Sequence, residues 1–180
     1  MKKMLSAVLG LLFTLTVLVS CQTGPVQAGS DTEEPTADVT VSAEPLTAAG
    51  IAASVAVGAS FTESAELFEN NEYFASAFLQ PRGLADRVVS YDAYVSASVT
   101  TQEIFVMEAK TEEDTKAIVA QIEEYINQQR DLYGSYAKGE TPRLEDAVIA
   151  VNGCFVVYVA SEDNDAAADL VQSLFAHAAK

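Results

Sequence analysis

The sequence predicts an α+β fold, a two-layer sandwich in which a four-stranded antiparallel sheet packs against helices. Two observations carry this prediction. The C-terminal part of the chain reads as strand-strand-helix twice, with alternating side chains in the strands and helical periodicity between them. An Asn-Gly pair between two apolar runs indicates the second hairpin. One or two further helices are expected ahead of the sheet.

Residues 1–20 predict a lipoprotein signal peptide. A short basic start precedes an apolar stretch that would span roughly 24 Å as a helix, less than a membrane-spanning segment needs. The stretch ends in LVSC at residues 18–21, which resembles the lipobox of bacterial lipoproteins. This resemblance implies cleavage between Ser20 and Cys21 and a diacylglycerol on the Cys21 sulfur. We therefore expect a protein anchored to the cell membrane through Cys21 and facing the extracytoplasmic side.

Residues 21–45 predict the lipidated cysteine followed by a disordered tether, and residues 46–180 predict a single α+β domain. The tether segment contains three prolines, two glycines and no aromatic residue, so it cannot bury enough apolar surface to offset its chain entropy. Beyond Cys21 the chain has one further cysteine, Cys154, which excludes an intramolecular disulfide framework in the cleaved protein.

The net charge argues against a nucleic-acid partner. The full chain carries a formal charge of −16, and cleavage would leave 26 acidic and 8 basic residues, a charge of −18. Such a surface repels phosphates, so we expect neither nucleic-acid binding nor electrostatic docking on anionic lipid.

Two helices are predicted at the start of the domain. Residues 46–61 are small and apolar at helical spacing, although two glycines weaken the pattern. Residues 62–79 predict a second helix, and Pro81 ends it. The apolar anchors of this second helix are Leu67, Phe68, Phe74, Phe78 and Leu79.

The first strand-strand-helix unit follows. Residues 90–99 alternate as a strand, and residues 103–110 are the expected hairpin partner. The inward side chains of the first strand would be Tyr91, Ala93, Val95, Ala97 and Val99. Thr111 with Asp114 resembles a capping box, so a helix is expected from there to about Tyr136. One stripe of this helix carries Ile118, Ile122, Tyr125, Ile126, Leu132, Tyr133 and Tyr136.

The second unit occupies residues 146–179. A two-residue turn at Asn152-Gly153 would place Val151 opposite Cys154 and give a hairpin with two apolar faces, which needs cover on both sides. Residues 161–179 predict the last helix. We expect it on the same face as the first long helix, with the weaker N-terminal helices covering an edge or the second face.

The stretch from about residue 88 to 176 resembles a domain-of-unknown-function family of small lipoproteins from Gram-positive Firmicutes. The resemblance rests on the strand at 103–109, the long helix that contains QQRDLY, the hairpin VIAVNGCFVVYVAS and the acidic SEDNDAA before the last helix. It implies that the protein is a lipoprotein located at the cell membrane. It carries no site residue, because no activity is established for that family.

No catalytic, cofactor or metal site is expected. His177 is the sole histidine and lies near the C-terminus, where it is predicted to be an exposed helix residue. Cys154 has no basic neighbour in its turn and is predicted to be a small core residue.

The carboxylates have structural explanations as well. Asp163, Asp165 and Asp169 lack the loop glycine and bidentate glutamate of a calcium loop, and a helix cap explains them. Glu123 and Glu124 lie on an exposed helix face and define no cleft.

The expected function is therefore a non-enzymatic binding or interaction module at the cell surface. Its partner would be a protein or envelope component, docked on the second apolar sheet face unless the N-terminal helices cover that face. The alternative is a small-ligand binder or sensor accessory protein, with a pocket between sheet and helix lined by Tyr125, Tyr133, Tyr158 or Phe155. A preformed cavity would favour this alternative, and a solid core would exclude it.

Overall fold

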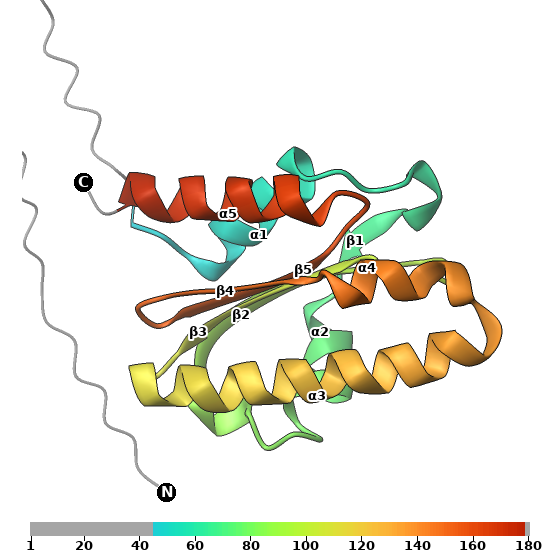
Figure 1. Ribbon diagram of the computed structural model, residues 1–180. Helices are drawn as coiled ribbons and strands as arrows, with labels where there is room; N and C mark the ends of the chain where they lie inside the picture. Colours follow the sequence, from blue (N-terminus) through green and yellow to red (C-terminus); the bar gives the residue numbers. More distant parts are fainter. Residues whose placement is uncertain (1–44, 179–180) are drawn as a thin grey trace, which may run out of the picture. The chain divides into compact units, whose positions relative to one another are not determined.

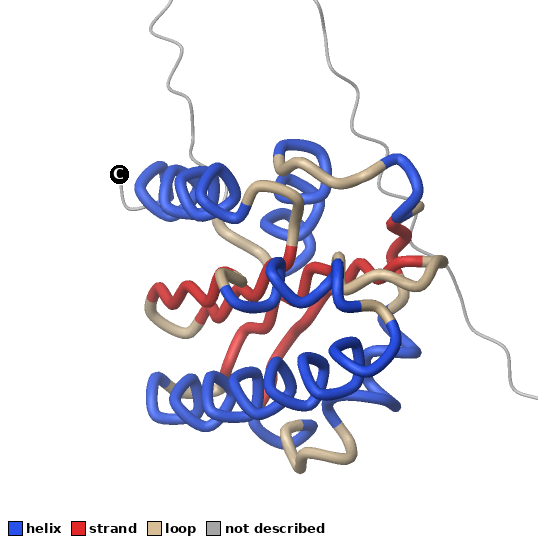
Figure 2. The backbone as a smooth tube through the Cα atoms, turned by 45° about the vertical axis from the view of Figure 1, so that its right-hand side comes forward, coloured by secondary structure: helices blue, strands red, loops and turns tan. Residues whose placement is uncertain are grey.

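The structure is a computed structural model that describes residues 45–178. The predicted signal peptide, Ser20, Cys21 and nearly all of the predicted tether lie outside the described residues. The described part folds around an antiparallel sheet, which Figures 1 and 2 show from two sides. The sheet has five strands in the order β1-β2-β3-β5-β4. The strands are β1 (Leu67–Glu69), β2 (Val88–Ser96), β3 (Glu103–Ala109), β4 (Val148–Asn152) and β5 (Phe155–Ala160). The helices are α1 (Ala48–Gly58), α2 (Asn71–Phe74), α3 (Glu112–Tyr136), α4 (Thr141–Glu145) and α5 (Asn164–Ala178).

Helices cover both faces of the sheet, which gives three layers instead of the predicted two (Figure 1). α2 and α3 pack on the face that carries Phe105 and Met107. α1 and α5 pack on the opposite face, which carries Ile104 and Val106. The central strands are apolar on both sides, so each face needs its own cover. The expectation that the two long helices share a face is therefore wrong.

The second apolar face of the sheet is buried under α1 and α5. Val106, Val157 and Val159 on this face are each 0% exposed. A Cβ on Gly58 would lie 2.8 Å from Leu170 Cδ2, so a glycine at the end of α1 permits its close approach to α5. This face is not available as the docking surface that the sequence suggested.

The fifth strand replaces part of the second predicted helix. β1 pairs antiparallel with β2, and its Phe68 lies opposite Val95. Glu66 breaks the expected helix because it adopts the left-handed conformation, with φ of 46°. Asn70 then caps α2 by accepting a hydrogen bond from the Tyr73 amide at 3.0 Å. A π-helical turn, Ala75–Leu79, continues α2 and buries Phe78.

β2 is shorter than predicted at its C-terminal end. Tyr91, Ala93 and Val95 lie on the α3 side, as the alternation predicts. Ala97 and Val99 instead lie in the bend that leads to β3, and both are exposed. The inward face of the strand therefore stops at Val95.

The second hairpin keeps its predicted faces but not its predicted register. Val151 pairs with Val156 and Asn152 with Phe155, so the loop residues are Gly153 and Cys154. Gly153 has φ of 54°, and Asn152 is not among the residues with positive φ. A positive φ at the first loop residue alone is typical of a type II′ turn. Because each partner moves by two positions, the side chains stay on the predicted sides of the sheet.

Replacing Gly153 with alanine is expected to lower the free energy of unfolding by about 1 kcal/mol, measured by urea denaturation. A Cβ at this position would contact nothing within 4 Å, so the loss comes from the positive φ alone. Gly139→Ala is the matched control, because its Cβ is equally free and its φ is not positive. Equal effects of the two substitutions would contradict the turn assignment.

The long helix begins where its cap predicts. Thr111 Oγ1 accepts a hydrogen bond from the Asp114 amide at 3.1 Å. The stripe of Ile118, Ile122 and Ile126 is buried against the sheet. Toward the C-terminal end of α3 the stripe becomes exposed, and this end of the helix forms one wall of the candidate site.

Candidate functional site

A pocket opens between the sheet and the second half of α3, beside the loop that joins β2 to β3. Its volume is about 530 Å³, within the size range of small-ligand sites. The strands β1 to β3, the connecting loop and α3 all contribute side chains. The lining residues are Phe68, Asn70, Tyr73, Val95, Ser96, Ala97, Ser98, Thr100, Gln102, Glu103, Tyr125, Gln129, Leu132 and Tyr133. We call this cavity the Glu103 pocket.

Glu103 is the only carboxylate among these lining residues, and two tyrosines hold it. Tyr125 on α3 donates its hydroxyl to Glu103 Oε2 at 3.0 Å. Tyr158 on β5 donates to Glu103 Oε1 at 3.1 Å. Glu103 is the first residue of β3, and strand alternation points it to the same side as Phe105, toward α3. The sheet and the helix therefore fix the carboxyl together.

The surroundings of Glu103 favour its neutral form. Burial raises the pKa of this carboxyl from 4.5 to about 7, and the hydrogen bonds from Tyr125 and Tyr158 offset part of the rise. Burial also raises the pKa of both tyrosines well above 10, and the adjacent negative charge of Glu103 adds to this. The tyrosines thus remain donors at neutral pH, whereas Glu103 is divided between its two protonation states.

This pKa predicts a pH-dependent stability. A carboxyl whose pKa is raised on folding stabilises the folded state below the unfolded pKa, and that contribution is lost as the pH rises through the folded pKa. The window here runs from about 4.5 to about 7. We expect the Glu103 contribution to the free energy of unfolding to fall by up to about 3 kcal/mol across it.

The measurement is urea unfolding of the wild type and Glu103→Gln at about pH 5 and about pH 8. The difference in stability between the two proteins should change in favour of Glu103→Gln as the pH rises. Glu108→Gln is the matched control, because Glu108 lies in the same strand and bonds to Ser90 Oγ at 2.7 Å, outside the pocket. A difference that is independent of pH would contradict the raised pKa of the Glu103 carboxyl.

Aromatic packing holds Tyr125 in place. The ring of Phe78 meets it edge-on at a centroid distance of 5.4 Å. The Arg82 guanidinium carbon lies 5.2 Å from the Tyr125 centroid, and Arg82 Nη2 donates to Gln128 Oε1 at 3.0 Å. The π-helical turn of residues 75–79 carries Phe78, so this irregular turn supports a wall of the pocket.

Hydrogen bonds also anchor the loop at the mouth of the pocket. Tyr133 Oη donates to the Thr100 carbonyl at 2.8 Å. Thr100 Oγ1 donates to Glu140 Oε2 at 2.7 Å, and Gln102 Nε2 donates to Thr62 Oγ1 at 2.7 Å. These bonds tie the loop to three separate segments, so the pocket is preformed.

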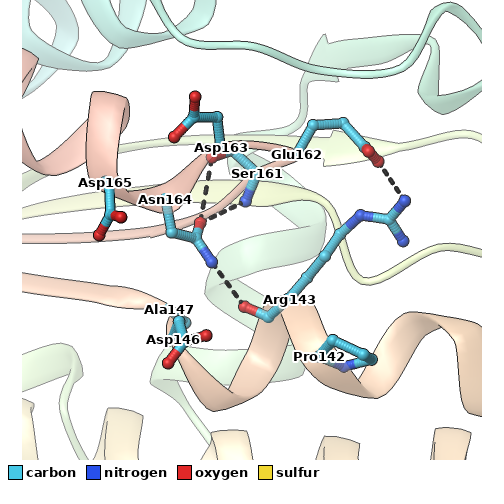
Figure 3. Close-up of a pocket in the computed structure, with 9 residues that line it drawn as sticks. All are labelled: Pro142, Arg143, Asp146, Ala147, Ser161, Glu162, Asp163, Asn164 and Asp165. Atoms are coloured by element: carbon cyan, nitrogen blue, oxygen red, sulfur yellow. Dashed lines mark hydrogen bonds and ion pairs between the residues drawn. The ribbon is translucent and has the colours of Figure 1, made fainter.

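A larger polar groove of about 680 Å³ lies between α4 and the start of α5 (Figure 3). Asn164 Oδ1 accepts from the Ser161 amide at 2.8 Å, and Asn164 Nδ2 donates to the Arg143 carbonyl at 2.9 Å. Arg143 also forms an ion pair with Glu162. These bonds join α4 to the start of α5, which is a structural role. We do not assign this groove as the site.

The predicted helix cap is present at Asp163, Asp165 lies in the first turn of α5, and Asp169 is exposed further along the helix. Asp163 Oδ1 accepts a hydrogen bond from the Ala166 amide at 3.0 Å, which caps α5. Within residues 45–178, no group of three His, Cys, Asp or Glu side chains is placed to hold a metal ion.

Some of the remaining residues singled out from the sequence line the pocket, and others lie elsewhere. Tyr125 and Tyr133 line the pocket, and Tyr158 reaches its carboxyl. Phe155 lies on the opposite sheet face, so its predicted place in the pocket is wrong. Cys154 is half-buried against the core, and His177 is exposed with Nδ1 2.7 Å from the Ser173 carbonyl.

Sequence reasoning missed Glu103. The signal was available, because Glu103, Phe105 and Met107 alternate along one strand face that is otherwise apolar. In this protein the acidic residue at the start of that face lies where the core opens to the pocket.

The fold and the pocket define an antiparallel α+β domain with a carboxyl-centred cavity between sheet and helix. Residues 84–161 match the family described as a domain of unknown function (DUF4358). This stretch covers the sheet from β2 to β5 together with α3 and α4, and it includes Glu103, Tyr125, Tyr133 and Tyr158. No curated protein and no solved structure matches the chain. In the described part of the chain, no helix combines the length and the apolar character that crossing a membrane requires.

Proposed function

We propose that this chain is a lipid-anchored, extracytoplasmic, non-enzymatic binding protein that takes a small ligand in the Glu103 pocket. The observation that carries the proposal is a carboxyl held by two tyrosine hydroxyls in a cavity of about 530 Å³. Perturbed titratable groups inside a cavity are typical of functional sites. The LVSC sequence at residues 18–21 supports lipid attachment at Cys21 and an extracytoplasmic location.

The pocket favours a small ligand over a protein docked on the sheet. The apolar sheet face that a protein partner would need is covered by α1 and α5. The pocket, in contrast, combines exposed aromatic side chains at its rim, Phe68 and Tyr73, with a single charged group at its base. Half of its lining residues are polar, and such groups in a concave site orient a small ligand and make its binding specific.

The lining residues support binding without catalysis. They include one carboxyl and no histidine, cysteine or lysine. Glu103 could exchange a proton with a ligand, but the lining offers it neither a second acid or base of matched pKa nor an activated nucleophile.

The test blocks the pocket from its rim. Ala97 lines the pocket and is exposed in the loop after β2, so Ala97→Trp should fill the cavity without disturbing the core. Ala120→Trp is the matched control, because Ala120 is exposed on α3 and lies outside the pocket. Each full-length protein is screened by thermal unfolding against organic cations, amino acids and neutral saccharides.

At least one compound should raise the unfolding temperature of the wild type and Ala120→Trp but not of Ala97→Trp. A ligand at about 100 times its dissociation constant stabilises the folded state by about 2.7 kcal/mol, a shift that is easily measured. The proposal is wrong if no compound acts, or if Ala97→Trp responds as the wild type does.

A further inference from the structure

We propose that the ligand of the Glu103 pocket is an organic cation, a compound that carries a primary or quaternary ammonium group and places it against Glu103. This inference rests on the proposed function, because it names the chemical class that the same site would bind. Three properties of the site and the charge of the whole chain support it.

The carboxyl has no basic partner. None of the lining residues is lysine or arginine. Among residues 45–178, the ion pairs join Arg87 to Asp114 and Arg143 to Glu140 and Glu162, and none involves Glu103. Arg82 contacts the Tyr125 ring, but its hydrogen bonds go to Gln128 and to backbone carbonyls. A charged Glu103 thus lacks a counter-ion, which a cationic ligand would supply.

The carboxyl also has spare acceptor capacity. Each oxygen accepts one hydrogen bond, from Tyr125 or from Tyr158. A carboxylate offers about four lone-pair positions, so about two remain for a ligand. The two tyrosine hydroxyls orient the carboxyl without neutralising it.

The walls suit a positive charge. Four aromatic residues line the pocket: Phe68, Tyr73, Tyr125 and Tyr133. Aromatic faces attract ammonium groups through the ring quadrupole, and grouped aromatic side chains are a common means of binding quaternary ammonium ligands. Phe68 and Tyr73 are 44% and 56% exposed, so they stand at the entrance where a ligand arrives.

The whole chain favours cations as well. Its formal charge of −16 raises the local concentration of positive ligands and lowers that of anions. A neutral saccharide is the competing ligand class, since it could use the aromatic rings and hydrogen bonds without needing the charge.

The test compares choline with 3,3-dimethylbutan-1-ol, which has the same shape with carbon in place of the charged nitrogen. Putrescine serves as the primary-amine probe and N-acetylglucosamine as the neutral saccharide. Binding is measured by isothermal titration calorimetry on the full-length chain in a non-ionic detergent. We expect choline or putrescine to bind at least about tenfold more tightly than either neutral probe, a difference typical of one desolvated charge interaction.

Substitution then assigns the charge to one residue. Glu103→Gln keeps the size of the side chain and should weaken binding of the cation by at least about tenfold. Glu108→Gln makes the same change in the same strand outside the pocket, and its affinity should stay within about twofold of the wild type.

The pH dependence gives an independent readout. The groups that face Glu103 are Tyr125, Tyr158 and Tyr133, and burial raises the pKa of all three above 10, so they keep their protons near neutral pH. The pKa of Glu103 is about 7. The affinity for the cation should therefore rise about tenfold from about pH 6 to about pH 8. Titrations in two buffers with different ionisation enthalpies should detect the proton released on binding near pH 7.

The possible results separate the class of ligand from the function of the pocket. Equal binding of choline and its neutral isostere, or binding unaffected by Glu103→Gln, overturns the assignment to cations and leaves the pocket as a binding site. The assignment to cations is also wrong if neither choline nor putrescine binds. In that case the thermal-unfolding screen with Ala97→Trp decides separately whether the pocket binds any ligand.

Discussion

Phe105→Ala is expected to lower the free energy of unfolding by about 3–5 kcal/mol. Phe105 lies on the central strand β3 and is 3% exposed. Its ring packs against four others, with centroid distances of 4.6 Å to Phe74, 5.3 Å to Phe78, 5.2 Å to Tyr158 and 5.7 Å to Tyr125. The substitution would leave a cavity where two layers meet, beside the two tyrosines that hold Glu103.

Urea denaturation measures this loss, and Phe68→Ala is the matched control. Phe68 lies on the edge strand and is 44% exposed, so its removal should cost less than about 1 kcal/mol. The account of the core is wrong if both substitutions destabilise the protein equally. A milder change, Phe105→Leu, should retain the fold and show an intermediate loss, which keeps the test informative if Phe105→Ala does not fold.

Cys21→Ala is expected to abolish retention of the protein in the membrane fraction. In the proposed anchor, acyl chains attached at Cys21 hold the protein to the bilayer, and each buried methylene contributes about 0.8 kcal/mol. The wild type should fractionate with membranes, and its intact mass should show the acyl groups and the loss of residues 1–20. The variant should be released or remain uncleaved.

Cys154→Ala is the matched control for this experiment, because it removes the other cysteine. Cys154 is half-buried in the described domain, and its variant should still fractionate with membranes. The lipobox interpretation is wrong if the wild type and Cys21→Ala are equally soluble and neither carries the mass of acyl groups.

Local patterns predicted the elements of the C-terminal part of the domain well. The order of β2, β3, α3, β4, β5 and α5 follows the predicted order, and Thr111 caps α3 as expected. The turn at Gly153 was displaced by one residue, because Asn-Gly also permits a turn in which only the glycine has positive φ. The shift of two positions between paired residues left the alternation of side chains unchanged, so the predicted faces of the hairpin were correct.

Local sequence patterns did not predict how neighbouring elements pack against one another. The choice of sheet face for α5 depends on where α1 packs, which no periodicity reveals. β1 was missed because Leu67, Phe68, Phe74 and Phe78 also fit a helical stripe, and only the left-handed Glu66 separates strand from helix. Propensity arguments are weakest for short edge strands, whose stability comes from their neighbour.

The candidate site was predicted in part. Helical spacing grouped Tyr125 and Tyr133 toward the sheet, and both line the pocket. Glu103 accepts hydrogen bonds from Tyr125 and Tyr158. It lies 22 residues before Tyr125 and 55 before Tyr158, so only the tertiary fold brings the three together. A half-buried carboxyl between tyrosines that are distant in the sequence leaves no short sequence motif.

The most direct test of the account is a carbon-detected NMR titration of the Glu103 side-chain carboxyl, assigned by comparison with Glu103→Gln. A midpoint near pH 7, which falls when choline is added, is the result expected for a desolvated carboxyl that receives a cation. A midpoint near 4.5 that choline leaves unchanged would contradict the account, because it would mean that water rather than protein surrounds the carboxyl.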